Sequence, residues 1–397
     1  MRYLSLPYFI AIAIDAIGFT IIAPVLIPLT NHVVNNSGLS QHLLYGTILA
    51  IYSLSFMIGA PILGALSDLL GRRKVLIIAS VGVLLGYTFY AFSIHLSSLY
   101  FLIFGRIATG FFAASQCIAQ AAMIDLSSHK NRVNNIGLIA SAMTAGLVIG
   151  PLASLSLSHE NLNLSTLKMP FYSIMGILIL NLLYLIFFLK ESYQINSFNK
   201  EINLLKHQFQ QFLQQFSSKS MLTLFSAFFV FELGWSLYYQ SLAIELPLNL
   251  KLAPQALALL LSFLGISLTL ALLILVRISS RYFKPIKMSA TALGLGCLAL
   301  ILQFSTKNLA AYYFLGIIIT SVVALTYSSL VAQLSQQRNA NNQGLLMGTS
   351  DALLALAFTI TGLLAGLLAY YLPGLNLLVA AGFWLSALVL LMLRKSL

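Results

Sequence analysis

Long apolar stretches alternate with short polar ones along almost the whole chain. A helix of about 20 apolar residues crosses the roughly 30 Å hydrocarbon core of a bilayer. Such stretches lie at 6–30, 43–66, 75–95, 98–124, 133–156, 169–189, 220–244, 254–276, 288–305, 308–334, 343–370 and 373–393. The pattern therefore predicts an all-α membrane protein with twelve transmembrane helices and both termini on one side.

The longest polar stretch, 190–219, divides these spans into two sets of six. We therefore predict an N-terminal six-helix bundle (1–189), a cytoplasmic linker (190–219) and a C-terminal six-helix bundle (220–397). Apolar residues recur in the linker at spacings of three and four, at Phe198, Ile202, Leu205, Phe209, Phe212 and Phe216. This spacing predicts an amphipathic helix on the inner membrane surface, with a coiled-coil seam as the alternative.

A faint internal repeat relates the two halves. The sequence Leu-Ser-Phe at 54–56 recurs at 261–263, and Asn-Asn-x-Gly-Leu at 134–138 recurs at 341–345. Both matches have the same offset, 207 residues, and fall at equivalent places in the two sets of spans. The repeat predicts two pseudo-symmetric bundles.

Composition excludes a soluble protein. Hydrophobic residues make up 59% of the chain and charged residues 8%, with a mean hydropathy of +0.94. The net charge of +12 comes from cations between the spans, which favours contact with membrane lipids over nucleic acid. Cys117 and Cys297 both fall inside apolar spans, and we expect no disulfide, metal site or cofactor.

The distribution of cations predicts the orientation. With cytoplasmic termini, seventeen of the 21 Lys and Arg residues fall on the inner side. Only Lys168, Lys251 and Lys307 fall outside, and Arg106 lies within a helix. Short cytoplasmic loops are enriched in Lys and Arg, so both termini are predicted to be cytoplasmic.

Four charged residues fall deep inside predicted spans: Asp15, Arg106, Glu232 and Asp351. Each costs about 2.5–3.5 kcal/mol at bilayer depth, so they are expected to face a cavity or one another. Static interhelical pairs are the alternative, but three acids share a single base. At least two carboxyl groups must therefore be protonated or await a charged ligand.

Glu232, Trp235 and Tyr239 fall on one face of the seventh predicted helix. Aromatic rings beside a carboxylate suit a cationic or amphipathic organic ligand. The alternative is that the aromatic residues mark the membrane interface, which applies equally to Tyr238.

The loop at 64–74 combines glycines with charge between two adjacent spans. Its pattern, Gly64-x-x-x-Asp68-x-x-Gly71-Arg72-Arg73, resembles the loop between helices 2 and 3 of major facilitator superfamily transporters. The resemblance implies a cytoplasmic latch, in which Asp68 caps a helix of the other half and Arg72 pairs with Asp68 and Asp125. Leu69 stands where the family usually has a cation. A solvated loop that only sets topology is the alternative.

Two further stretches strengthen the resemblance. Residues 15–28 are similar to the first helix of proton-coupled drug antiporters, including the tetracycline efflux proteins. Arg106, followed four residues later by Gly110, is similar to the superfamily motif whose arginine is implicated in proton transfer.

The fifth predicted helix carries Gly137, Gly146, Gly150 and Pro151. Their spacing resembles the antiporter motif, although Ser154 and Leu155 replace its final glycine pair. The motif implies an export hinge, and a small-residue packing face is the alternative.

The resemblance implies a monomeric secondary transporter of a bacterial inner membrane that exports a small organic compound in exchange for protons by alternating access. Asp15 and Glu232 are then the leading proton or substrate acids. One alternative is a transporter of a defined metabolite such as a siderophore, although a polyanion would require more cavity cations than Arg106. Another is a sensor on the same fold. The predicted helices do not bring together a nucleophile, a general base or a metal-binding cluster, so an enzyme is not expected.

Overall fold

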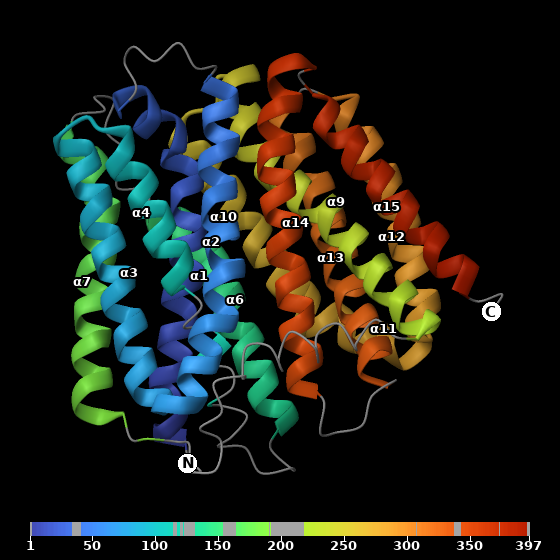
Figure 1. The fold of residues 1–397 in the computed structure, drawn as a ribbon. Coiled ribbons are helices and arrows are strands. Elements are labelled where there is room, and N and C mark those ends of the chain that lie inside the picture. The colour runs from blue at the N-terminus through green and yellow to red at the C-terminus, as the bar shows by residue number, and fades with distance from the viewer. Residues whose placement is uncertain are drawn as a thin grey trace. The chain divides into compact units, whose positions relative to one another are not determined.

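The computed structural model describes the chain except residues 1, 34–40, 114–116, 120–121, 123–131, 154–163, 190, 192–217, 307, 337–342, 373 and 395–397. The regular elements among the described residues are all helices (Figure 1). They are α1 (Arg2–Val33), α2 (Gln41–Leu70), α3 (Arg72–His95), α4 (Leu99–Phe112), α6 (Arg132–Ala153), α7 (Leu164–Phe188), α9 (Lys219–Asn249), α10 (Pro254–Leu270), the π-helical η2 (Ala271–Leu275), α11 (Val276–Tyr282), α12 (Pro285–Phe304), α13 (Leu309–Gln336), α14 (Gln343–Tyr371) and α15 (Leu375–Arg394).

Eleven stretches of helix among the described residues are long and apolar enough to cross a membrane. A shorter apolar stretch, Ala142–Ala153, lies in α6, within the fifth predicted span. The all-helical, multi-span expectation is therefore confirmed, while the count of twelve and the orientation of the termini stay predictions. The predicted amphipathic helix of the linker falls on residues 192–217, outside the described residues.

The eighth predicted span ends later than expected. The sequence predicts its end at residue 276, but the helix continues through η2 and α11 to Tyr282. A charged residue at a membrane boundary does not break a helix. The helix ends at Tyr282, and Phe283 is extended (φ −120°, ψ 139°). Pro285 keeps the next residue, Lys284, extended as well (φ −67°, ψ 146°), because the residue before a proline is disfavoured in the helical region.

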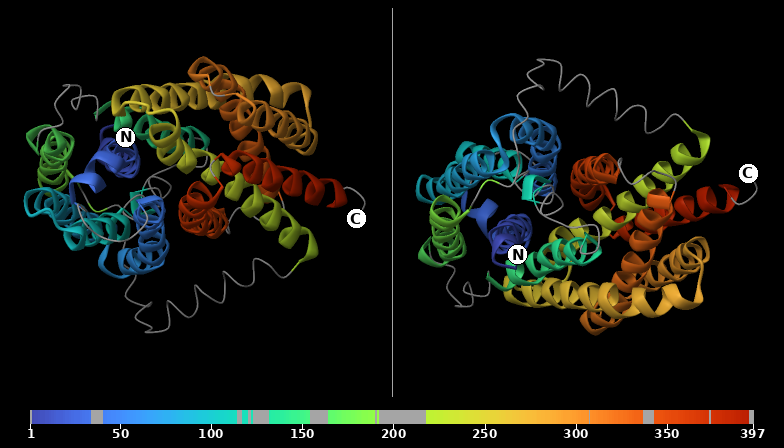
Figure 2. Two further views of the ribbon diagram at one scale, coloured as in Figure 1. Left: turned by 90° about the horizontal axis from the view of Figure 1, so that it is seen from above. Right: turned by 90° about the horizontal axis from the view of Figure 1, so that it is seen from below.

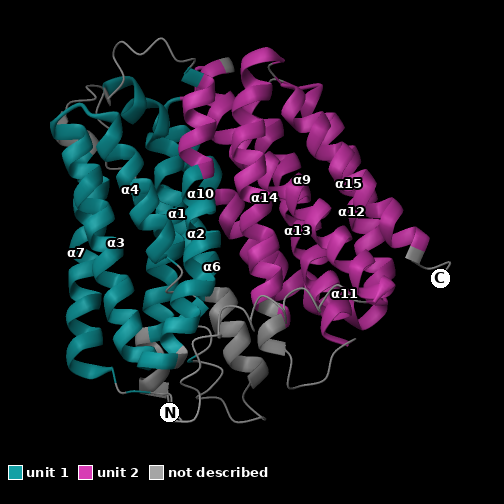
Figure 3. Ribbon diagram, in the orientation of Figure 1, with its two compact units in different colours: residues 1–41, 51–205, 253–262 teal, residues 42–50, 206–252, 263–397 magenta. Residues whose placement is uncertain are grey.

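The chain divides into two compact units (Figure 3). Unit 1 comprises residues 1–41, 51–205 and 253–262, and unit 2 comprises residues 42–50, 206–252 and 263–397. Two helices, α2 and α10, are thus divided between the units. These two helices carry the copies of the Leu-Ser-Phe repeat, at 54–56 and 261–263. The domain boundaries at 189 and 220 stay a prediction.

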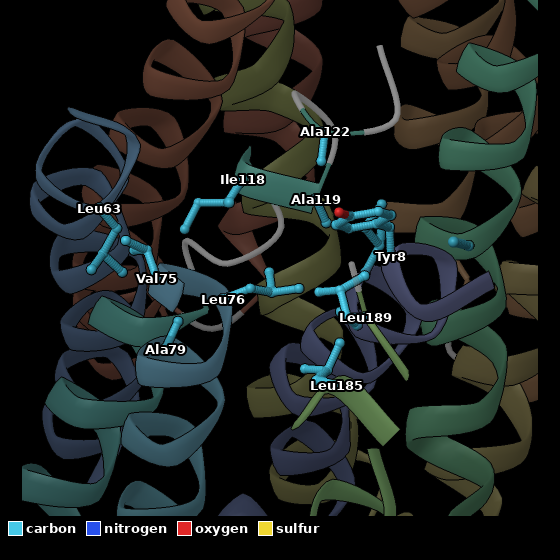
Figure 4. Close-up of a cluster of buried hydrophobic side chains, with 13 residues drawn as sticks. Tyr8, Leu63, Val75, Leu76, Ala79, Ile118, Ala119, Ala122, Leu185 and Leu189 are labelled. Carbon is cyan, nitrogen blue, oxygen red and sulfur yellow. The ribbon is translucent and has the colours of Figure 1, made fainter. Parts of the chain in front are cut away.

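In unit 1, α1 packs along α6, and α3 packs against both α4 and α7. Figure 2 shows the helices of this unit end-on, side by side. Buried apolar side chains flank the 64–74 loop, with Leu63 before it and Val75 and Leu76 after it (Figure 4). They pack with Leu185 and Leu189 at the end of α7. This cluster fixes the α2–α3 connection on the rest of unit 1.

In unit 2, α9 packs against α14 and α15, and α12 packs against α13 and α15. The centre of this packing is Trp384 of α15, which is fully buried. Its indole N–H donates to the carbonyl oxygen of Phe231 at 3.1 Å, and its ring stacks on that of Phe231 with centroids 6.3 Å apart. The hydrogen bond satisfies the one polar atom of a large buried side chain.

Candidate functional site

A buried polar cluster lies inside unit 1. It joins Asp15 of α1, Tyr52 of α2, Tyr87 and Tyr90 of α3, and Arg106 of α4, all of which are buried. We call these five residues the unit 1 cluster. Asp15 and Arg106 were predicted from the sequence, and the structure places both beside the same tyrosine.

Tyr52 is the centre of the unit 1 cluster. The guanidinium carbon of Arg106 lies 4.8 Å from the centroid of the Tyr52 ring, a cation–π contact. Tyr52 also lies within electrostatic reach of Asp15 and Tyr90. The Tyr52 ring also contacts that of Phe19, with centroids 5.3 Å apart. An acid, a base and a phenol therefore share one enclosed environment.

Gly110, one helical turn after Arg106, explains why Arg106 lies beside Tyr52. A Cβ atom on Gly110 would collide with the backbone of Tyr52. Only glycine lets α4 approach α2 so closely there, and Arg106, one turn earlier on α4, then lies over the Tyr52 ring. The Arg-x-x-x-Gly spacing thus has a steric cause in this chain.

Two tyrosines of the unit 1 cluster, Tyr87 and Tyr90, pack against each other and against α7. The Tyr87 and Tyr90 rings lie 5.6 Å apart, and each lies against Phe171 of α7. The Tyr90 hydroxyl hydrogen-bonds with the Thr109 hydroxyl of α4 at 2.9 Å. These contacts tie α3, α4 and α7 around the buried acid and base.

Unit 2 contains two acidic residues that were predicted from the sequence, Glu232 and Asp351. Glu232 of α9 is 1% exposed and lies within electrostatic reach of Asp351 of α14. Tyr327 of α13 lies within reach of both carboxyl groups. The Oε2 atom of Glu232 has no hydrogen-bond partner among the described residues. We call Glu232 and Asp351 the unit 2 acid pair.

The aromatic residues predicted on α9 contact one another. The Trp235 ring lies 5.6 Å from that of Tyr239 and 6.0 Å from that of Tyr238. Tyr238 and Tyr239 are both buried, and Trp235 is partly exposed. The burial of Tyr238 and Tyr239 inside unit 2 argues against their marking a membrane interface.

Neutral hydrogen bonds join α9 to α14 beside the acid pair. The Gln240 side-chain amide donates to Thr361 Oγ1 at 2.8 Å and to the Phe358 carbonyl oxygen at 3.1 Å. The Thr361 hydroxyl lies 2.8 Å from Ser236 Oγ. The Ser236 hydroxyl also contacts the carbonyl oxygen of Glu232 at 2.6 Å. This polar row occupies the α9–α14 contact.

The stretch predicted as the 64–74 loop is helical except at Gly71, because α2 ends at Leu70 and α3 begins at Arg72. This tight connection is held by an acid that the sequence did not single out. Glu191 accepts from the backbone N–H groups of Arg72 and Arg73 at 2.9 and 3.2 Å, and so caps α3. Gly71 precedes this cap with φ 94° and ψ 149°, a region that is essentially restricted to glycine, and a Cβ there would meet Glu191. The loop geometry therefore depends on both Gly71 and Glu191.

The two arginines of the loop contact unit 1 itself. The Arg72 guanidinium donates to Ser67 Oγ, and the Arg73 guanidinium donates to the Ile186 carbonyl oxygen at 2.6 Å. The Asp68 side chain and the whole of Asp125 lie outside the described residues. The latch, with its pairing of Arg72 to Asp68 and Asp125, stays a prediction, as does the role of Gly64.

The glycines of α6 form a close contact with α1. A Cβ on Gly146 would lie 2.7 Å from the backbone of Ala16, and one on Gly150 would lie 2.9 Å from the Ile17 carbonyl oxygen. The Thr20 hydroxyl donates to the Gly146 carbonyl oxygen at 2.9 Å. This is a small-residue packing face. The hinge predicted at Gly137 and Pro151, which both lie within α6, stays a prediction.

Sequence reasoning missed several residues of these clusters. Tyr52, Tyr87 and Tyr90 are three of 18 tyrosines in an apolar chain, and nothing in their spacing marks them. Glu191 and Glu245 carried a usable signal, since the chain has only nine acidic residues. Glu245 is buried near the end of α9 and accepts from Asn376 Nδ2 at 2.6 Å and from the Gly374 N–H at 3.2 Å.

Comparison with known proteins adds a family. Residues 8–349 match the family model of the Major Facilitator Superfamily. The chain is 27% identical to the tetracycline resistance protein, class C, of Escherichia coli over 363 residues, covering 88% of this chain and 85% of that protein. It is 40% identical to the class H protein of Pasteurella multocida over 139 residues, only 35% of this chain and 34% of that protein.

A solved structure has the same fold. The D-xylose-proton symporter superimposes with a TM-score of 0.76 at 16% identity, covering 98% of this chain and 97% of that one. The family model spans most of the chain, and both the helical fold and the relatives agree with it. The chain therefore belongs to the major facilitator superfamily.

Proposed function

We propose that the chain is a proton-coupled exporter of a small cationic or amphipathic organic compound, working by alternating access in a bacterial inner membrane. Family membership makes it a multi-pass membrane transporter and not an enzyme. The finer proposal is supported by relatives that are tetracycline resistance proteins and by the buried charges of the two units.

The unit 1 cluster is the observation that carries the proposal. Asp15 and Arg106 lie about Tyr52 in an enclosed environment, where each charge strongly affects the others. Binding of a proton at Asp15 leaves Arg106 as an excess positive charge, and loss of the proton restores neutrality. Such a charge change can be linked to the exchange between two conformations of a transporter.

The acid pair of unit 2 supports a cationic ligand. Two carboxyl groups without a buried Lys or Arg among the described residues of that unit require a proton or a cation for neutrality. Trp235 and Tyr239 on the same helix offer aromatic faces for an organic cation. Exchange of one inward proton for one outward monovalent cation moves no net charge, so the pH gradient alone drives it. For a compound without net charge, the inward proton also gains about 2.3 kcal/mol per 100 mV of membrane potential.

Everted membrane vesicles test the proposal. The vesicles are acidified inside, and release of protons is followed with a pH dye after addition of tetracycline or a quaternary ammonium dye. We expect a substrate-triggered proton release that Asp15→Asn abolishes. Thr30→Val is the matched control, because Thr30 is buried on the same helix but bonds only within it. Unchanged release by Asp15→Asn refutes the role of Asp15.

The same assay separates the alternatives. A sensor on this fold gives no substrate-triggered proton release with any compound. A siderophore transporter responds to the polyanion and not to the cationic dye. A drug-susceptibility panel in an efflux-deficient bacterium then identifies the substrate class independently of the dye.

A further inference from the structure

The turn between α11 and α12 carries a dense group of exposed cations. Arg277, Arg281, Lys284 and Lys287 are all exposed, and we call them the α12 basic patch. No acidic residue occurs anywhere between Glu245 and Asp351. Among the described residues, none of the four charged groups has a hydrogen-bond or ion-pair partner.

The matching loop of unit 1 is different. At the offset of 207 residues, the 64–74 loop corresponds to 271–281, where Arg281 takes the place of Lys74. In unit 1 the Arg72 and Arg73 guanidinium groups both donate to the protein. The copy in unit 2 has lost the aspartate and both glycines, and Ser279 and Ser280 stand where unit 1 has Arg72 and Arg73, so that only the charge of Lys74 is matched, by Arg281. Because the charged groups of the α12 basic patch have no partner among the described residues, they are available for a ligand outside the protein.

The α12 basic patch also has backbone donors. α12 begins at Pro285, and its N-cap residue Lys284 makes no side-chain capping bond. The N-terminus of a helix attracts anions through its unpaired N–H groups and the helix dipole. Lys284 and Lys287 flank this N-terminus, and Arg281 lies in the last turn of α11. A phosphate group fits this combination of donors.

The position of the α12 basic patch at the end of a candidate membrane span favours a lipid headgroup as the source of the phosphate. The candidate membrane span Pro254–Tyr282 ends at the patch. α11 buries no residue, and Ile278, Tyr282 and Phe283 are 50%, 79% and 54% exposed. Exposed aromatic and aliphatic side chains beside cations are typical of the membrane–water interface.

We propose that the α12 basic patch binds the phosphodiester headgroup of an anionic phospholipid. The headgroup accepts from Lys284, Lys287 and the N-terminus of α12, and its acyl chains lie along the exposed apolar side of α11. Arg277 and Arg281, one turn apart on α11, supply further positive charge to the headgroup region. This site is independent of the proposed transport chemistry.

Native mass spectrometry of the detergent-solubilised full chain tests the site. The protein is offered equal amounts of phosphatidylglycerol and phosphatidylcholine with the same acyl chains. We expect preferential retention of phosphatidylglycerol. The triple variant Arg281→Gln, Lys284→Gln, Lys287→Gln should reduce this preference about fivefold or more, because cations near an anionic headgroup each add to the attraction.

Two further variants separate the site from net charge and from misfolding. Lys168→Gln, Lys219→Gln, Lys251→Gln removes three cations elsewhere and should retain the preference. Arg281→Lys, Lys284→Arg, Lys287→Arg keeps the charge and should also retain it. An equal loss in the first of these, no preference in the unmodified chain, or removal of the preference by millimolar inorganic phosphate would each overturn the proposal.

Discussion

The two units differ in how their buried charges are balanced. In unit 1 an acid and a base, Asp15 and Arg106, lie around one tyrosine. In unit 2 two acids, Glu232 and Asp351, lie near each other, and no Lys or Arg is buried among the described residues of that unit. Unit 1 can therefore be neutral by itself, whereas unit 2 needs a proton or a cationic ligand. We infer that unit 2 is the half in which ligand charge is sensed most directly.

Removal of the base in unit 1 is the strongest way to break this comparison. Arg106→Gln leaves Asp15 as a buried charge without its counter-charge, which is expected to cost about 3–5 kcal/mol of stability. Thermal unfolding of the purified protein measures the loss, and the vesicle assay should show no proton release.

Arg106→Lys is the control for that variant. A lysine keeps the charge but lacks the planar guanidinium that lies 4.8 Å from the Tyr52 ring centroid. We expect it to recover part of the stability and little of the transport. If Arg106→Gln were as stable as the unmodified protein, the idea that unit 1 balances its charges internally would be wrong.

Replacing one acidic residue in each unit by its amide sharpens the comparison, because the two variants should change the stability of the protein in opposite directions. Asp15→Asn leaves the buried Arg106, which cannot lose its charge, without a counter-charge and should lower stability by about 3 kcal/mol. Glu232→Gln removes a buried acid whose Oε2 lacks a partner in the described part of the chain, and should be neutral or stabilising by up to about 1 kcal/mol. Melting temperatures at neutral pH test both, and equal losses would contradict the comparison.

How far the sequence predicts these clusters follows from the physics of each residue. Asp15, Arg106, Glu232 and Asp351 stand out because charge inside an apolar span is costly. The structure places them in α1, α4, α9 and α14, and their proposed roles stay predictions. Their neighbours do not stand out, because a tyrosine such as Tyr52 is compatible with any membrane helix.

Contacts between distant segments are the part that sequence could not supply. Glu191 reaches the N-terminus of α3 across 119 positions of the chain. Trp384 contacts Phe231 across 153 positions. Periodicity specifies which face of a helix is apolar, but not which helix covers it.

The 64–74 loop extends the comparison from buried charges to backbone geometry. Gly71→Ala should cost about 1–3 kcal/mol, because φ 94° with ψ 149° is strained for any residue with a Cβ, and that Cβ would meet Glu191. Gly64→Ala is the matched control, because a Cβ there meets nothing within 4 Å. Differential scanning fluorimetry should separate the two. A tolerated Gly71→Ala would mean that the cap by Glu191 does not hold the loop.

The smallest expected effect concerns the neutral hydrogen bonds that hold α9 to α14 in unit 2. Thr361→Val removes the hydroxyl between Gln240 and Ser236, and should cost about 1 kcal/mol, because Gln240 keeps its bond to the Phe358 carbonyl oxygen. Thr359→Val, two residues away, removes a hydroxyl that bonds only within α14 and should cost less. If Thr361→Val destabilised the protein as much as Arg106→Gln, neutral contacts would matter in unit 2 as much as charge balance does in unit 1, and the contrast between the units would lose its electrostatic basis.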